Sequence, residues 1–127
     1  MKWIFNNNRP IYAQLVEQMQ VGILTGEYPP GSSIPSVRTL AVEAEVNPNT
    51  MQKALAELER EQLVFSQRTS GRFVTEDRSM IEEAKLELAK MHMQNFLREM
   101  QKLGYGKEEV ISMINQKTKE GGYDAGI

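Results

Sequence analysis

Four polar residues within five positions have the side chains best suited to bind another molecule: Asn49, Thr50, Gln52 and Lys53. The amides of Asn and Gln can each make two hydrogen bonds to adenine, and Lys can donate to guanine or to a phosphate. The preceding pair, Asn47 and Pro48, favours the start of a helix, where free backbone N–H groups also attract phosphate. Such residues are most often only a solvated helix face, so the interpretation depends on their surroundings.

Arginines lie on both sides of this segment. Arg38 stands in the first turn of the preceding predicted helix, a place from which it can reach a DNA phosphate. Further along, Arg68 and Arg72 flank a predicted hairpin turn in which Ser70 and Gly71 leave room for close approach of a partner. Arginine at such a tip is favoured in a minor groove. Alone, each arginine would more often be a solvated charge and the hairpin an ordinary turn.

The elements that position these side chains follow from apolar spacing and helix caps. We expect a first helix from Pro10 to about Gly26, a second opening on the N-cap Ser36, and a third capped by Asn47. Two short strands follow, around residues 63–65 and 73–74. This order is a helix-turn-helix with a wing, whose second helix enters the major groove. The third helix should bury Met51, Ala54, Leu55 and Leu58.

Residues 78–103 predict one long helix that stops at Gly104, and residues 107–119 predict a last one. A heptad pattern runs along the long helix through Leu86, Ala89, Met93, Phe96, Met100 and Leu103. A second apolar stripe comprises Ile81, Ala84, Leu88 and Met91. One short following helix cannot cover both faces. We therefore expect one face to pack within its own subunit and the heptad face to form a homodimer, although most helical stripes are intramolecular core.

The predicted fold class is mainly α with a small β-wing: a winged helix-turn-helix domain (1–77), a two-helix dimerisation appendage (78–120) and a flexible tail (121–127). The absence of cysteine excludes disulfides and thiolate zinc sites. There is no signal peptide and no run long enough to span a membrane, so we expect a cytoplasmic protein. The net charge of −2, with eight basic and nine acidic side chains in residues 1–78, does not by itself indicate a nucleic-acid partner.

Three stretches match a known family in residue type and spacing: Ile34 to Ala41, Val46 to Leu55, and Leu58 to Glu61. They resemble the GntR family of bacterial transcription regulators, and Pro10-Ile11-Tyr12 with Gly26 to Gly31 extends the resemblance over residues 9–76. The short tail, with Val-Asn-Pro-Asn-Thr at the recognition turn, looks most like the YtrA subfamily. The resemblance implies that Arg38 contacts the DNA backbone or a guanine. It also implies a set at the major groove and the wing: Asn49, Thr50, Gln52, Lys53, Gly71 and Arg72.

The chain departs from the family pattern at several positions. Glu45, Gln62 and Thr69 replace glycines usual in the helix-turn-helix turn, after the recognition helix and in the wing. We expect each of these residues to be drawn toward positive φ, at a cost of about 1 kcal/mol. Pro48 and Gln52 stand where the family often has arginine, which leaves the operator sequence open.

The sequence thus predicts a homodimeric DNA-binding regulator, a repressor acting on a palindromic double-stranded operator. By resemblance, its target would be a transporter operon and its own gene. The alternative is a winged-helix module that binds proteins and no DNA, which the net charge and missing arginines favour slightly. We expect no enzyme, cofactor or metal site: the single histidine, His92, lies in mid-helix, and no HExxH, GxSxG or phosphate-loop pattern occurs. The sequence does not indicate a small-molecule effector.

Overall fold

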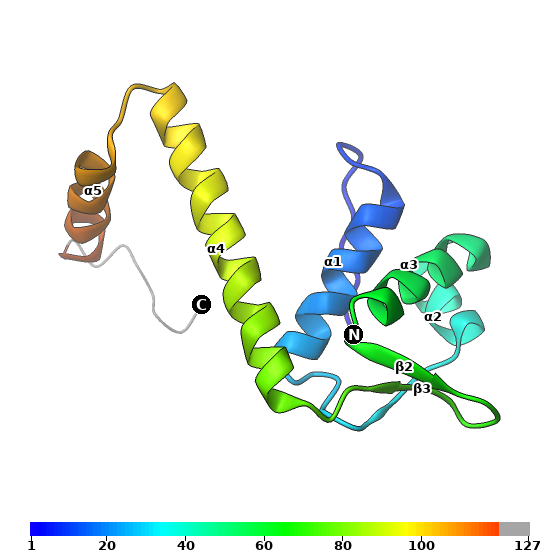
Figure 1. The fold of residues 1–127 in the computed structure, drawn as a ribbon. Coiled ribbons are helices and arrows are strands. Elements are labelled where there is room, and N and C mark those ends of the chain that lie inside the picture. The colour runs from blue at the N-terminus through cyan, green and yellow to red at the C-terminus, as the bar shows by residue number, and fades with distance from the viewer. Residues whose placement is uncertain (120–127) are drawn as a thin grey trace. The chain divides into compact units, whose positions relative to one another are not determined.

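The computed structural model describes residues 1–119, which form five helices and three short strands (Figure 1). In chain order these are α1 (Ile11–Leu24), β1 (Ser33–Ile34), α2 (Val37–Ala44), α3 (Pro48–Arg60), β2 (Val64–Gln67), β3 (Gly71–Val74), α4 (Arg78–Lys102) and α5 (Lys107–Lys119). The predicted flexible tail, 121–127, lies outside the described residues. The chain divides into two compact units, Met1–Lys85 (the head) and Leu86–Ile127 (the tail unit). The division falls inside α4, and the domain limits given above stay a prediction.

The predicted fold class is confirmed: helices dominate, and the strands form one small antiparallel sheet. The strand order is β1-β3-β2, so the hairpin of β2 and β3 is joined on its open edge by the two-residue β1. In the register, Ser33 lies opposite Phe73, and Val64 lies opposite Val74. The sheet therefore ties the segment after α1 to the wing.

The core of the head lies where α1 and α2 pack against α3. The four residues expected on the inner face of α3 are all fully buried, which confirms the predicted orientation of that helix. In α1, the inner face is equally closed, but Ile11 and Tyr12 in its first turn are 38% and 39% exposed. The apolar pattern thus predicted the buried face of α3, whereas the first turn of α1 leaves two large apolar side chains partly in solvent.

Helix ends in the head follow the predicted caps. Ser36 Oγ accepts a hydrogen bond from the Thr39 amide at 3.1 Å, and Asn47 Oδ1 accepts from the Asn49 amide at 2.7 Å. Glu45 (φ 56°) ends α2 in the left-handed region, and Gln62 (φ 65°) follows α3 in the same region, as the missing glycines predicted.

The expectation for Thr69 is wrong. Its φ is not positive, and the left-handed position in the wing is taken instead by Gly71, with φ 89°. The hairpin turn is closed by a hydrogen bond from the Ser70 amide to the Gln67 carbonyl, 3.1 Å long. A glycine two residues further along therefore supplies the conformation that the wing needs.

The tail unit contains the greater part of α4, and α5. The helix α4 ends as predicted, with Gly104 at φ 93° and the Tyr105 amide bonded to the Met100 carbonyl at 3.1 Å. Among the described residues of this unit, Val110 is the one that is buried. Within residues 1–119 no helix is both long enough and apolar enough to cross a membrane.

Candidate nucleic-acid interface

The N-terminal half of α3 presents the predicted reading residues to solvent. Asn49, Gln52 and Lys53 are exposed, and Thr50 is half-buried. Their direction follows from the helix itself, because Met51, Ala54 and the later apolar residues occupy the opposite, buried face. The side chains predicted at a major groove therefore share one accessible helix face.

Charge is segregated along α3. Its first nine residues, 48–56, contain Lys53 and no acid, whereas Glu57, Glu59 and Glu61 fall in or just beyond its last turns. Arg60 bonds to Glu57 through two guanidinium nitrogens, and these contacts lower the pKa of Glu57 to about 2. The negative charges are thus kept away from the end of the helix that would meet DNA.

Glu61 faces inward toward α1. Gln20 Nε2 donates a hydrogen bond to Glu61 Oε1 at 2.7 Å, which links α1 to the end of α3. Burial, together with a hydrogen bond to Glu57, raises the pKa of Glu61 above its usual value. This carboxyl belongs to the packing of the head and lies just beyond the C-terminal end of α3, away from the reading residues.

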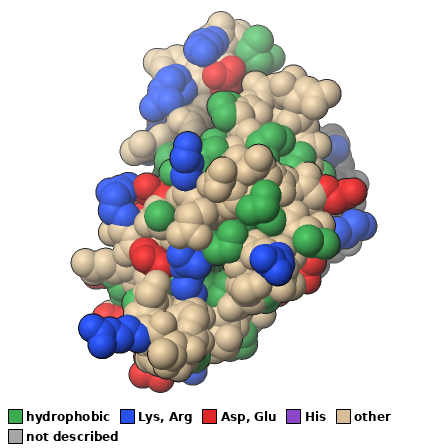
Figure 2. All heavy atoms as spheres, turned by 90° about the vertical axis from the view of Figure 1, so that its right-hand side faces the viewer, with side chains coloured by type: hydrophobic (Ala, Val, Ile, Leu, Met, Phe, Trp, Pro, Cys, Tyr) green, Lys and Arg blue, Asp and Glu red, His purple; other side chains and the backbone are tan. Residues whose placement is uncertain are grey.

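Arg38 is exposed in the first turn of α2, the helix that packs against α3. Figure 2 looks onto the side of the molecule that carries α2, α3 and the wing, and shows Lys and Arg side chains scattered among apolar and acidic ones. There is no continuous basic block in this view. The candidate interface therefore has individually placed cations rather than a strongly positive surface.

The tip of the wing is open to a partner. Arg68, Ser70 and Gly71 are exposed, and nothing lies within 4 Å of the place where a Cβ on Gly71 would be. Behind the tip, Phe65 and Phe73 are opposite each other on β2 and β3, with stacked rings 6.4 Å apart. This pair stiffens the hairpin that carries the tip.

Arg72 differs from the other predicted contact residues because it is already engaged. Its Nε donates to Glu59 Oε1 at 2.6 Å, and its side chain is only 20% exposed. Ser66 Oγ donates to the same oxygen at 2.7 Å. Although burial works in the other direction, the bonds from Ser66 and Arg72 keep the pKa of Glu59 below its usual value. The position of Arg72 on the wing was predictable from the sequence, but this ion pair was not.

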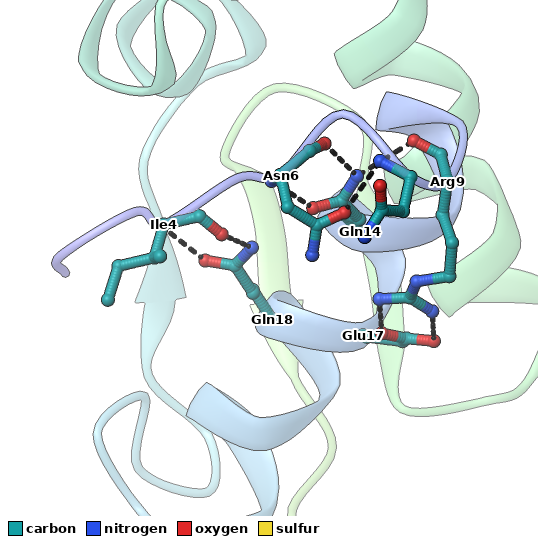
Figure 3. A network of polar contacts seen from close by, with 7 residues as sticks. Ile4, Asn6, Arg9, Gln14, Glu17 and Gln18 are labelled. Carbon is teal, nitrogen blue, oxygen red and sulfur yellow. Dashed lines mark hydrogen bonds and ion pairs between the residues drawn. The ribbon is translucent and has the colours of Figure 1, made fainter.

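A second feature missed from the sequence is the attachment of the N-terminal segment to α1 (Figure 3). The side-chain amide of Gln14 accepts from the Asn6 amide at 2.9 Å and donates to the Asn6 and Arg9 carbonyls. Gln18 makes the same reciprocal pair with Ile4, at 3.0 and 2.6 Å. The available signal was Gln14 itself, a polar residue on the apolar side of α1 that is only 2% exposed.

Arg9 is tied into the same region. Its two terminal guanidinium nitrogens bond to Glu17 at 2.6 and 2.8 Å. The bidentate contact raises the pKa of Arg9 and uses its charge within the protein. Arg9 is therefore not one of the candidate DNA contacts.

The predicted dimer residues of α4 form an exposed stripe. Leu86, Met93, Phe96 and Leu103 are 56%, 55%, 45% and 73% exposed, Ala89 is exposed, and Met100 is half-buried. On the second stripe, Ile81 is buried in the head, Ala84 and Leu88 are half-buried, and Met91 is 48% exposed. His92 is exposed. No cluster of acidic or histidine side chains in the described part of the chain could hold a metal ion.

Comparison with known proteins identifies the family of the chain. The family model described as "Bacterial regulatory proteins, gntR family" matches residues 11–74, which include all the predicted DNA-contact residues. The chain is 36% identical over 117 residues to YhcF of Bacillus subtilis, named an uncharacterized HTH-type transcriptional regulator. That match covers 92% of the chain and 97% of YhcF. It is 32% identical over 111 residues to YtrA, named an HTH-type transcriptional repressor of the same species, covering 87% of the chain and 85% of YtrA.

Two solved structures are informative. A GntR family transcriptional regulator from Listeria monocytogenes superposes with a TM-score of 0.82 at 41% identity, covering 88% of this chain and 98% of that one. The structure of AraR(DBD) in complex with operator ORX1 matches 57% of this chain and 93% of its own, with a TM-score of 0.53 and 28% identity. The first resembles nearly the whole chain, and the second relates the head to a domain that is bound to an operator. The family and these neighbours are regulators rather than enzymes.

Proposed function

Because the chain belongs to the GntR family of bacterial regulatory proteins, we propose that it is a homodimeric repressor that binds a palindromic DNA operator. The observation that carries the proposal is the N-terminal half of α3: exposed, free of acids and bearing the reading residues. The likeness of the head to an operator-bound domain supports the binding mode. The relative named as a repressor supports the outcome of binding.

In this proposal the exposed polar residues of α3 contact base edges in the major groove. Arg38 on α2 binds the DNA backbone, and Arg68, Ser70 and Gly71 at the wing tip approach the neighbouring minor groove. Arg72 belongs to the same surface, with its Nε bonded to Glu59. One head supplies few cations, so two heads on a two-fold site are needed for tight binding.

The exposed stripe on α4 is the proposed dimer interface. Large apolar side chains at heptad spacing are rarely left in water by a monomer. A hollow of about 430 Å³ between α4 and α5 shares Phe96 and Met100 with the stripe, and its other lining residues are Val110, Met113, Ile114, Lys117 and Thr118. A second copy of the chain, packed two-fold on this face, would cover both features. It would also place the two heads for two half-sites.

The target we propose is a transporter operon, together with the gene of the regulator itself. The resemblance of the short tail and the recognition turn to the YtrA subfamily supports this choice. Such a role places the protein in the cytoplasm, where the operator is. No cofactor is part of the proposal.

The test is selection of fragments of the source genome by the full-length protein, followed by measurement of binding to the recovered sequence and to random DNA of equal length. We expect recovery of a palindrome upstream of a transporter operon. We also expect affinity that falls steeply as the salt concentration rises, since phosphate contacts release counterions. No retention of DNA at low salt would favour the alternative, a winged-helix module that binds protein partners.

A further inference from the structure

One carboxylate oxygen joins both strands of the wing to the recognition helix. Ser66 on β2 and Arg72 on β3 are directly opposite each other in the hairpin. Both donate to Oε1 of Glu59 on α3, at 2.7 and 2.6 Å. We call these three residues the wing clamp.

The clamp acts on one face of the hairpin. Side chains alternate between faces along a strand, so Ser66 and Arg72 face α3 while the stacked pair of Phe65 and Phe73 lies on the other face. The exposed tip, residues 68–70, lies one cross-strand pair beyond the clamp. Glu59 therefore holds the hairpin close to its tip, and this contact sets the orientation of the tip relative to α3.

Because both side chains are partly shielded from solvent, this ion pair should stabilise the fold more than an exposed surface pair does. The side chains of Arg72 and Glu59 are 20% and 31% exposed, and the carboxylate also accepts the neutral bond from Ser66. Glu57, two residues earlier on α3, provides the contrast: it has the same charge, but it bonds to Arg60 in its own helix. Of these two acids, Glu59 connects different elements of the fold.

We propose that Glu59 is a positioning residue for DNA recognition, which fixes the wing against α3 through Ser66 and Arg72, and that Arg72 acts within the protein instead of on a phosphate. This inference rests on the proposed function. Reading an operator requires α3 and the wing tip to fit adjacent grooves together, and a wing ordered beforehand loses less entropy on binding. Binding to random DNA depends chiefly on charge and needs no such fit.

The first experiment needs no DNA. Amide hydrogen exchange of β2 and β3 is measured in the full-length protein and in Glu59→Gln, with Glu57→Gln as the control that removes the same charge from the same helix. We expect exchange in the wing to rise about tenfold in Glu59→Gln, because a charge-assisted contact is lost, and to be unchanged in Glu57→Gln. Ser66→Ala, which alters no charge and is milder for folding, should raise it by a smaller factor.

The second experiment compares affinity for the selected operator with affinity for random DNA, as a ratio. Glu59→Gln and Arg72→Gln should each lower this ratio about fivefold to tenfold, and the double variant should lower it no further, because both break one contact. The slope of log affinity against log salt should stay the same in Arg72→Gln. Direct contact of Arg72 with a phosphate would instead reduce that slope by about 1 and let Glu59→Gln strengthen binding.

The outcomes separate the two proposals. Wild-type protein that prefers its operator, with Glu59→Gln indistinguishable from Glu57→Gln in exchange and in operator preference, overturns the wing clamp alone. A reduced salt slope in Arg72→Gln overturns the role given to Arg72. A wild-type protein that retains no DNA overturns the proposed function, and a recognition role for Glu59 with it, while hydrogen exchange still decides whether the clamp exists.

Discussion

The head and the tail unit use the same kind of amphipathic helix with opposite results. In the head, α1, α2 and α3 close on one another until Leu15, Leu40 and Leu55 are fully buried. In the tail unit, α4 and α5 leave large apolar side chains such as Phe96 and Leu103 in solvent. The head has enough elements to complete a core within one chain, whereas the tail unit has two helices and an uncovered stripe. We therefore expect the head to fold by itself, and the exposed stripe supports the proposal that a second copy of the chain covers the tail unit.

The largest expected effect is on the core of the head. Leu58→Ala removes a fully buried side chain from α3, and we expect a loss of about 2–5 kcal/mol in the free energy of unfolding. Because that core lies within one chain, the loss should be the same at low and high protein concentration. Urea unfolding of Leu58→Ala at two protein concentrations checks this. Leu103→Ala, at a 73% exposed position in the tail unit, is the matched variant. A concentration-dependent loss for Leu58→Ala would contradict a self-contained head.

The next largest effect is expected in the tail unit, on dimer formation. Phe96→Asp places a charge in the middle of the exposed heptad stripe, and we expect monomers and a loss of at least about 100-fold in operator affinity, since one head has too few phosphate contacts. Size-exclusion light scattering and a binding titration measure the two results. Ile4→Asp is the control, because Ile4 is 69% exposed in the head. If Phe96→Asp still elutes as a dimer, the heptad stripe is not the interface.

A smaller effect is expected on the reading face of the head. Lys53→Ala should weaken operator binding about tenfold and lower the salt slope by about 1, because one cation is removed from the acid-free half of α3. The thermal midpoint should not move, since the side chain is exposed. Lys85→Ala removes an equal charge from an exposed position on α4 and should leave binding as it was. Equal affinities in the two variants would mean that the DNA surface lies elsewhere.

The sequence predicted those features of the head whose cause is local. Ser36 and Asn47 cap their helices because the bonded amides are two or three residues away, and the buried face of α3 follows from spacing along one helix. The pair of Arg72 with Glu59 was not predictable in this way. It joins a strand to a helix across 13 residues, and it depends on how the hairpin is placed against α3.

The N-terminal attachment was missed for the same reason. Gln14 and Gln18 bind backbone groups of a segment that has no apolar periodicity of its own. The exposed face of α3 and the exposed stripe of α4 were predictable because exposure follows from helix geometry, but their roles stay predictions. Thr69 shows the limit of a family pattern: the conformation expected there is adopted at Gly71.

Glycine substitutions in the head test which positions require a positive φ. Glu45 and Gln62 have positive φ, so Glu45→Gly and Gln62→Gly should each raise the free energy of unfolding by about 0.5–1 kcal/mol through relief of backbone strain. Thr69→Gly should give no such gain, because the φ of Thr69 is not positive. Urea unfolding of the three variants side by side is the check. A gain at Thr69 equal to the other two would show that the wing turn differs from the one described.

The smallest expected effect is a pH dependence confined to the head, where Glu61 meets Gln20 between α3 and α1. The folded protein raises the pKa of Glu61, so its protonated form is favoured and stability should fall as pH rises through that pKa. Glu57, with a pKa of about 2, acts in the opposite direction, but only as pH drops below 4.5. As pH rises above 4.5, the wild type should therefore lose stability relative to Glu61→Gln, in which an amide keeps both hydrogen bonds. Parallel curves of unfolding free energy against pH for the two proteins would show that the fold does not raise the pKa of Glu61. A dependence on protein concentration would assign the titration to assembly instead of the head.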